Sequence, residues 1–152
     1  MRNALLLFAI VGSLTLVGSA TGAAGGCHDV SGTFVAVTVV PPECPSFFCT
    51  GGTLSGDLAG TYFFVATGVT PTGDLTGQST ITLENGAVIN GSDTSHLNGD
   101  GTFVTTVTVV GGTRQYEHAT GQLSAPGHFT ATGTEGTYAG TICLGAAESD
   151  DD

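Results

Sequence analysis

Positively charged residues are almost missing from this sequence: two of its 152 residues are Lys or Arg, against 13 Asp or Glu. One of the two is Arg2, so Arg114 is the only Lys or Arg after residue 24, and that part of the chain has a net charge near −12 (one arginine against 13 acids). Such a surface repels phosphate groups, so we expect neither a nucleic-acid partner nor binding to anionic membranes. We interpret the acidity as a means of solubility rather than as a cation-binding site.

Tryptophan is also absent, and no stretch after residue 24 has the apolar periodicity of an amphipathic helix. Without tryptophan, and with cysteine spacing unlike the inter-sheet pattern, the chain does not match an immunoglobulin domain. A Gly-x-Ser-x-Gly sequence is missing as well, so nothing supports a serine nucleophile of that type.

The first residues have the layout of a secretory signal. Arg2 precedes an apolar run, Ala4–Val17, and small residues suited to cleavage follow at Ala20–Ala24. A retained anchor would need roughly 20 apolar residues, and glycine and serine interrupt this run too early. Lipidation of Cys27 is a second alternative, but its "AGGC" lacks the usual leucine. We expect a signal peptide at 1–24 and an exported, secreted or periplasmic protein with no membrane insertion after signal removal.

All four cysteines follow the signal, and an even number in an exported chain favours disulfides. Four cysteines allow three pairings. Cys44 and Cys49 flank the short segment "PSFF", so a bridge between them is easy, which leaves Cys27 with Cys143. Zinc binding is the competing interpretation, but no two cysteines have the two-residue spacing of zinc knuckles, and we expect no metal.

Short runs rich in Thr, Val and aromatic residues alternate with glycine-containing turns about every 8–12 residues, which is typical of all-β domains. The pattern predicts eight or nine antiparallel strands in a domain at 27–145, followed by a disordered acidic tail at 146–152. Such a sheet closes into a barrel or folds into a sandwich, and composition leaves both open. The expected elements are a strand at 33–40, two segments at 51–69 bent near 56–60, a hairpin at 77–91 with a type I′ turn at Asn85-Gly86, a strand at 102–110, and three short strands in 116–144 broken at Gly121, Pro126–Gly127 and Glu135–Gly136.

One segment favours the barrel. "VVGGTRQYEHATG", residues 109–121, resembles without gaps the V-V-G-G-T-G-x-F-x-x-A-x-G segment of dirigent proteins, and it is similar to the matching segment of bacterial exported relatives of allene oxide cyclase. "GTLSGDLAGTYFF" (52–64) and "GTEGTYAGTICL" (133–144) resemble further strands of this group. The resemblance implies an eight-stranded antiparallel β-barrel, calycin-like or allene oxide cyclase-like, with a small-molecule cavity, no cofactor, and assembly as a dimer or trimer.

The charged residues of the segment depart from the family pattern. Arg114 stands where the motif has the last glycine of Gly-Thr-Gly, and Glu117 and Thr120 stand where dirigent proteins commonly have arginines. Tyr116 keeps the aromatic position. These departures argue against dirigent chemistry, which uses such groups around a reactive phenolic intermediate.

Candidate catalytic residues lie in the same segment. If residues 113–118 are extended, Arg114, Tyr116 and His118 face one way. Pointing into the lumen, they would supply a cation, a phenol and an imidazole to a cyclase or isomerase. Pointing outward, Arg114 is a surface residue.

Aromatic residues supply the candidate ligand contacts. Tyr62, Phe64 and Phe103 are the side chains expected to form a cavity wall, with ordinary core packing as the alternative. Tyr62 and Phe64 alternate with bulky neighbours along their strand, so each of its faces carries bulk.

An acidic stretch, "NGSDTSHLNGDG" (90–101), contains oxygen-bearing side chains that suggest calcium. The EF-hand register fails, because His96 occupies the first ligand position and Val107 the last. We therefore expect a polar hairpin loop without metal.

Two functions from different classes follow. The first is an exported barrel that binds a small apolar ligand or has a non-catalytic envelope role. The alternative is a cofactor-free cyclase or isomerase acting in the lumen, and a sandwich-type adhesion module is a third reading. The strands contain no clear acid–base pair, which favours the non-catalytic function.

Overall fold

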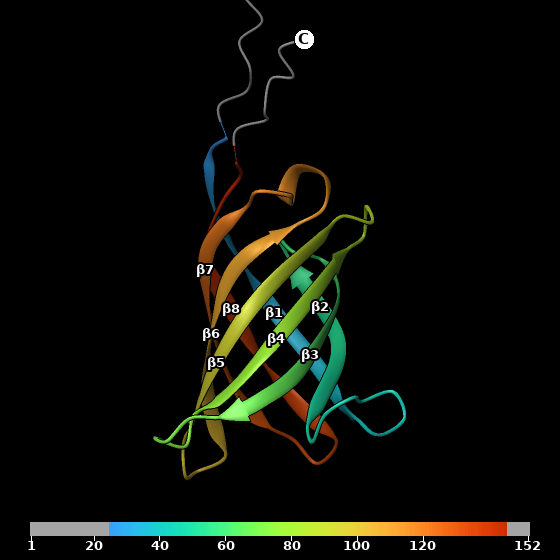
Figure 1. Cartoon of the computed structure of the whole chain (residues 1–152), viewed down its shortest axis with the longest axis vertical. Helices are drawn as coiled ribbons and strands as arrows, with labels where there is room; N and C mark the ends of the chain where they lie inside the picture. Colours follow the sequence, from blue (N-terminus) through green and yellow to red (C-terminus); the bar gives the residue numbers. More distant parts are fainter. Residues whose placement is uncertain (1–24, 146–152) are drawn as a thin grey trace, which may run out of the picture.

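The structure, a computed structural model, describes residues 25–145 and consists almost entirely of β-strands. Eight antiparallel strands, each paired with its neighbours in sequence, form a closed barrel (Figure 1). The predicted signal peptide at 1–24 and the acidic tail at 146–152 lie outside the described residues. Within 25–145, no helix is long and apolar enough to cross a bilayer.

The predicted all-β, eight-stranded barrel is confirmed. A one-turn 3₁₀ helix, η1, lies between the sixth and seventh strands. The strands are β1 (Cys27–Val39), β2 (Cys49–Gly56), β3 (Gly60–Val69), β4 (Leu75–Leu83), β5 (Val88–Leu97), β6 (Thr102–Gly112), β7 (Thr120–Phe129) and β8 (Gly133–Cys143), with η1 at Arg114–Tyr116.

Pairing of the first strand with the last closes the barrel. The β1–β8 register runs from Cys27 opposite Cys143 to Val37 opposite Gly133. A disulfide joins Cys27 to Cys143 at one end of this ladder, and a second joins Cys44 to Cys49. Both expected disulfides are therefore present, and two disulfides indicate an oxidising environment.

Several predicted strand limits are wrong. β1 begins at Cys27 rather than at residue 33, because its first residues pair with β8. β7 continues through Gly121 and Pro126, and β8 continues through Glu135–Gly136. Pro126 has no N–H to donate, and it lies where the β7–β8 ladder has no pairs between Ser124 and Gly127.

The predicted type I′ turn is also wrong. In the β4–β5 turn the Gly86 N–H donates to the Leu83 carbonyl at 2.8 Å, and Gly86 has a positive φ of 79°. A type I′ turn needs positive φ at Asn85 too, and Asn85 does not have it. Its side chain instead accepts the Ala87 N–H at 2.9 Å.

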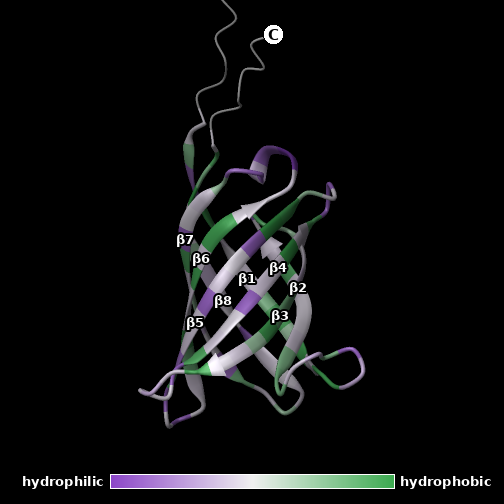
Figure 2. Ribbon diagram, viewed as in Figure 1, coloured by the Kyte–Doolittle hydropathy of each residue, from purple (hydrophilic) through white to green (hydrophobic). Residues whose placement is uncertain are grey.

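Alternation along the strands separates an apolar lumen from a more polar outer surface. β4 shows it most clearly, since every second residue from Leu75 to Leu83 is buried. In Figure 2 the η1 turn is coloured as hydrophilic, and apolar segments lie along the strands. The packing of inward side chains, rather than helices on the outside, therefore stabilises the barrel.

One end of the barrel is filled by its own loops. We call it the closed end; it comprises the β2–β3, β4–β5 and β6–β7 connections. Each of the three contributes a buried residue, Leu58, Ala87 and Ala119, to a core cluster that also includes Ile89 and Ile142. The Tyr138 hydroxyl fixes the first of them, since it accepts the Leu58 N–H at 2.9 Å and donates to the Ser55 carbonyl at 3.0 Å.

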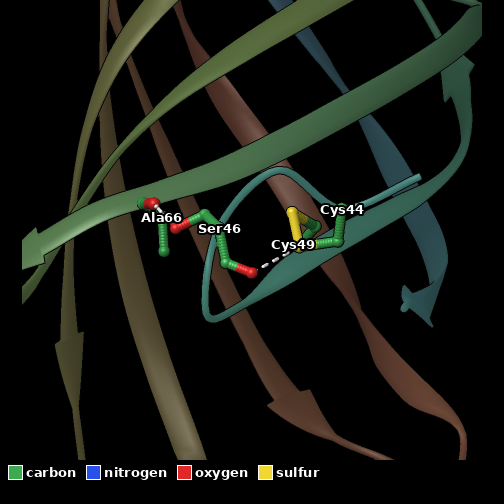
Figure 3. The surroundings of a disulfide bond; sticks show 4 residues. All are labelled: Cys44, Ser46, Cys49 and Ala66. Atoms are coloured by element: carbon green, nitrogen blue, oxygen red, sulfur yellow. Dashed lines mark hydrogen bonds between the residues drawn. A yellow bond between two sulfur atoms is a disulfide. The ribbon is translucent and has the colours of Figure 1, made fainter. Parts of the chain in front are cut away.

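The opposite end, which we call the open end, has the β1–β2, β3–β4, β5–β6 and β7–β8 loops. In the β1–β2 loop the Cys44–Cys49 disulfide closes a short ring, and the Ser46 hydroxyl donates to the Ala66 carbonyl of β3 (Figure 3). These contacts hold Phe48 beside Phe64, with ring centroids 6.3 Å apart.

The two disulfides should differ in their effect on stability. Cys27 and Cys143 are 116 residues apart, and Cys44 and Cys49 are 5 apart. Loop-closure entropy gives about 5 kcal/mol for the long loop and about 2 kcal/mol for the short one. In urea unfolding, Ser replacement of Cys27 and Cys143 should therefore cost more than twice as much as Ser replacement of the other pair. Equal losses would contradict this.

Tyr138→Phe should destabilise the closed end. It leaves the N–H of Leu58, a residue 1% exposed, without its partner, at a cost of about 1–3 kcal/mol. Tyr116→Phe is the matched control, because the Tyr116 hydroxyl makes no hydrogen bond to a described residue. Thermal unfolding should show a clear loss of stability for the first variant only, and similar losses for both would refute the assignment.

Candidate ligand-binding cavity

The lumen contains a cavity of about 110 Å³. An apolar cavity of ~150 Å³ takes up benzene, whereas sites for drug-sized ligands measure ~300–1,000 Å³. The cavity is smaller than the one that takes up benzene, so it encloses at most a single ring, and part of a substituted ring would extend toward the open end. Aromatic side chains make up a third of its lining: Phe34, Phe48, Tyr62, Phe64, Phe103, Phe129 and Tyr138.

Access to the cavity is from the open end. Leu97 and Phe129 line the cavity and are still 42% and 43% exposed, and both end strands at that side. Leu58, at the closed end, also lines the cavity but is 1% exposed. The Phe129 ring lies 5.2 Å from that of Phe103, so aromatic side chains form one side of the entrance.

One carboxyl group lies among these apolar side chains. Asp93 points inward from β5 and is 3% exposed. The Ser79 hydroxyl of β4 donates to its Oδ1 at 3.1 Å. One step nearer the open end, Ser95 and Thr105 share a hydrogen bond of 2.6 Å across β5 and β6. The β4–β6 wall of the cavity therefore carries a cluster of four polar side chains among apolar ones.

Two glycines make room for this arrangement. A Cβ on Gly91 would lie 2.5 Å from Ser79 Oγ and 3.1 Å from Asp93 Oδ1. A Cβ on Gly77 would lie 2.2 Å from the Phe64 ring. Because Gly77 pairs directly with Asp93, the Phe64 ring lies over the position opposite the carboxyl group.

Burial shifts the protonation equilibria in the cavity. Burial raises the pKa of Asp93 to about 6, with the Ser79 hydrogen bond opposing the shift. Burial also raises the pKa of Tyr62, against the effect of its hydrogen bonds with Thr134 and Thr50.

The three predicted ligand contacts, Tyr62, Phe64 and Phe103, all line the cavity. Phe64 is 8% exposed and packs on Ala66 and Leu75, so it is at once a core residue and part of the wall. Lining the cavity and packing in the core are not alternatives for these residues, because the hydrophobic core of this barrel fills the same lumen that contains the cavity.

The predicted catalytic group is placed elsewhere. Residues 113–118 form the η1 turn, not an extended strand, so Arg114, Tyr116 and His118 do not alternate on one face. None of the three is among the residues that line the cavity. Arg114 is exposed, has a φ of 58°, and donates from Nη1 to the carbonyl of Asn85 in the neighbouring turn. Tyr116 packs partly against the closed-end cluster, and His118 is exposed.

The acidic stretch is not a single loop. Its first part belongs to β5, where Asp93 and Ser95 face the lumen. His96 faces outward, with its Nδ1 2.7 Å from Asp74 Oδ1. In the turn that follows, Asp100 accepts hydrogen bonds from the Thr102 N–H and hydroxyl.

The sequence analysis missed Asp93 because a run of polar residues is typical of a loop, even where alternate residues of a strand face inward. The signal that would have found it is the hairpin itself. A strand as long as β4 following the Asn85-Gly86 turn must extend to about residue 97, and its alternate residues from Ile89 onward then face inward.

Comparisons with known proteins add little to this geometry. No protein-family model and no curated protein matches the chain. Among solved structures, a pterocarpan synthase dirigent protein aligns with 92% of this chain and 99% of its own, at 12% identity and a TM-score of 0.36. The barrel is established by its own strand pairing, and no site is transferred from that protein.

Asp93 should make stability depend on pH. Its pKa is about 6 when folded and near 3.8 when exposed, so between about pH 4 and 6 the folded state keeps a proton that the unfolded state has lost. Rising pH therefore favours unfolding, by about 3 kcal/mol in total. The side-chain amide of Asp93→Asn does not titrate in this range, so the stability of the variant lacks this dependence on pH. The free energy of unfolding of the natural protein should fall relative to that of the variant between about pH 4 and 7.

Glu84→Gln, which removes an exposed carboxylate at the closed end, is the control and should follow the natural protein across the same range. Parallel pH profiles for the natural protein and Asp93→Asn would show that the carboxyl group is not desolvated.

Proposed function

We propose that this protein is an exported barrel that binds a small, mainly apolar molecule in its lumen, without cofactor and without catalysis. The observation that supports this most is the cavity itself, which is lined in part by aromatic rings and has partly exposed lining residues at the open end. A barrel with a purely structural envelope role has no need of a cavity that opens to solvent.

The disulfides support the exported compartment of this proposal. Two disulfides and no free cysteine among residues 25–145 fit a protein that works in an oxidising space, secreted or periplasmic. The predicted signal at 1–24 agrees with this location.

Binding without chemistry is favoured over the cyclase alternative by where the charged groups lie. The alternative needs Arg114, Tyr116 and His118 in the lumen, and they lie on or next to the η1 turn. Asp93 is the single carboxyl group among the residues that line the cavity, and no Lys, Arg or His lines it to complete an acid–base pair.

Filling the cavity should weaken binding. Ala125 lines the lumen opposite Thr105, and Ala125→Leu adds three carbons there. Ala139→Leu makes the same substitution at an exposed position on β8 and is the matched control. In calorimetric titrations with toluene, the first variant should bind at least ~10-fold more weakly than the natural protein, equivalent to about 1.4 kcal/mol, and the second should bind equally well.

No saturable toluene binding to the natural protein would refute the proposed function. Equal binding by all three proteins would place the ligand outside the lumen.

A further inference from the structure

We propose that the cavity is selective for an organic cation: a small aromatic molecule with one protonated amine, held by the Asp93 carboxylate and the rings beside it. This inference rests on the proposed function, since it names the chemical class of the ligand for the same cavity. It starts from a carboxyl group in the lumen that no basic side chain of residues 25–145 balances.

The carboxylate has one free oxygen. Ser79 donates to Oδ1, and no described residue donates to Oδ2. Yet no fully buried polar side-chain atom of residues 25–145 lacks a hydrogen bond, so Oδ2 is reachable from the cavity. An acceptor at the wall of an apolar cavity is a site for a ligand that brings a donor.

No basic side chain among residues 25–145 neutralises this carboxylate. The strands beside β5 are β4 and β6, and their inward residues near Asp93 are Gly77, Ser79, Thr105 and Val107, none of which titrates. The titratable groups that share the cavity are the phenols of Tyr62 and Tyr138. Arg114 lies on η1, with its guanidinium on the carbonyl of Asn85. A buried charge without a partner is costly, so a ligand that brings its own cation is stabilised by pairing with this carboxylate.

The surrounding rings suit a cation better than a neutral donor. The Phe64 ring lies over Gly77, which pairs directly with Asp93, and Phe103 and Tyr62 line the same space. Aromatic faces attract an ammonium group, and the attraction grows when water is excluded. A carboxylate and several rings around one small space therefore complement an ammonium group on an aromatic body.

Long-range electrostatics act in the same direction. The chain has 13 acidic residues and two basic ones, so its field attracts cations and repels anions. An anionic ligand would meet both this field and the Asp93 carboxylate, whereas an amine would be drawn toward the cavity and then paired within it.

Protonation of Asp93 gives the binding a pH dependence. Burial raises its pKa to about 6, so the carboxylate is mainly ionised at neutral pH and mainly neutral below about pH 5. Amine binding should therefore weaken on acidification, while binding of a neutral ring should not.

The test compares benzylamine, benzyl alcohol and benzoate, which share one ring and differ in charge, by isothermal titration calorimetry on the natural protein. At about pH 7.5 benzylamine should bind at least ~10-fold more tightly than benzyl alcohol, as expected for a charge-assisted hydrogen bond, and benzoate should not bind. At about pH 5 the preference for benzylamine should largely disappear.

Asp93→Asn should lose at least ~10-fold in benzylamine affinity and keep its affinity for benzyl alcohol within about 3-fold, whereas the surface control Glu84→Gln should lose neither. Equal affinity of the natural protein for benzylamine and benzyl alcohol would overturn the amine selectivity and leave the proposed function standing. Absence of toluene binding to the natural protein, by contrast, would overturn the proposed function itself.

Discussion

Closure of the sheet by the β1–β8 ladder is the constraint on which the rest of the structure depends. Eleven register pairs, from Cys27 with Cys143 to Val37 with Gly133, join strands that begin and end the barrel. Without them the sheet has two free edges, and its inward side chains face water rather than one another. With them, a chain that has no helical layer on either face acquires an interior. The Cys27–Cys143 disulfide lies at one end of this ladder.

The closed end of the barrel contributes packing that stabilises the fold, whereas the open end provides the entrance to the cavity. At the closed end, loop residues such as Leu58 and Ala119 point inward and pack against buried residues near the ends of the strands. At the open end the β1–β2 loop contributes Phe48 to the cavity wall, but Leu97 and Phe129 are left partly exposed at the entrance. Between them lies the cavity, and the inward positions of Gly77 and Gly91 on β4 and β5 are covered by the side chains of Phe64, Ser79 and Val107. The two glycines let Phe64 and Asp93 approach each other across β4 and β5, so the polar group of the cavity lies beside an aromatic ring.

Much of the fold could be predicted from the sequence. Alternation in "TFVAVTVV" and regular glycine turns indicated an all-β domain, and cysteine count and spacing indicated both disulfides. Strand limits could not be predicted, because they depend on partners distant in sequence: Cys27 is in a strand only because Cys143 lies beside it. Aromatic wall residues were found because bulk at alternate positions is a local signal.

The acid of the candidate site was missed, since facing inward is a property of register and not of composition. The alternation of Arg114, Tyr116 and His118 was read as that of an extended strand. The backbone there forms the η1 turn, which places Arg114 on the surface. A positive φ at an arginine has no signature in one sequence.

The central claim is that small aromatic molecules enter the lumen, and methyl NMR of the natural protein titrated with toluene tests it most directly. The account predicts saturable shifts at the inward methyl groups of Leu75, Ile81 and Leu123, which line the cavity, and none at Val35 and Val37, which are more than half exposed on the outer face of β1. Shifts confined to the outer valines, or no saturable shift at the inward methyl groups, would contradict it.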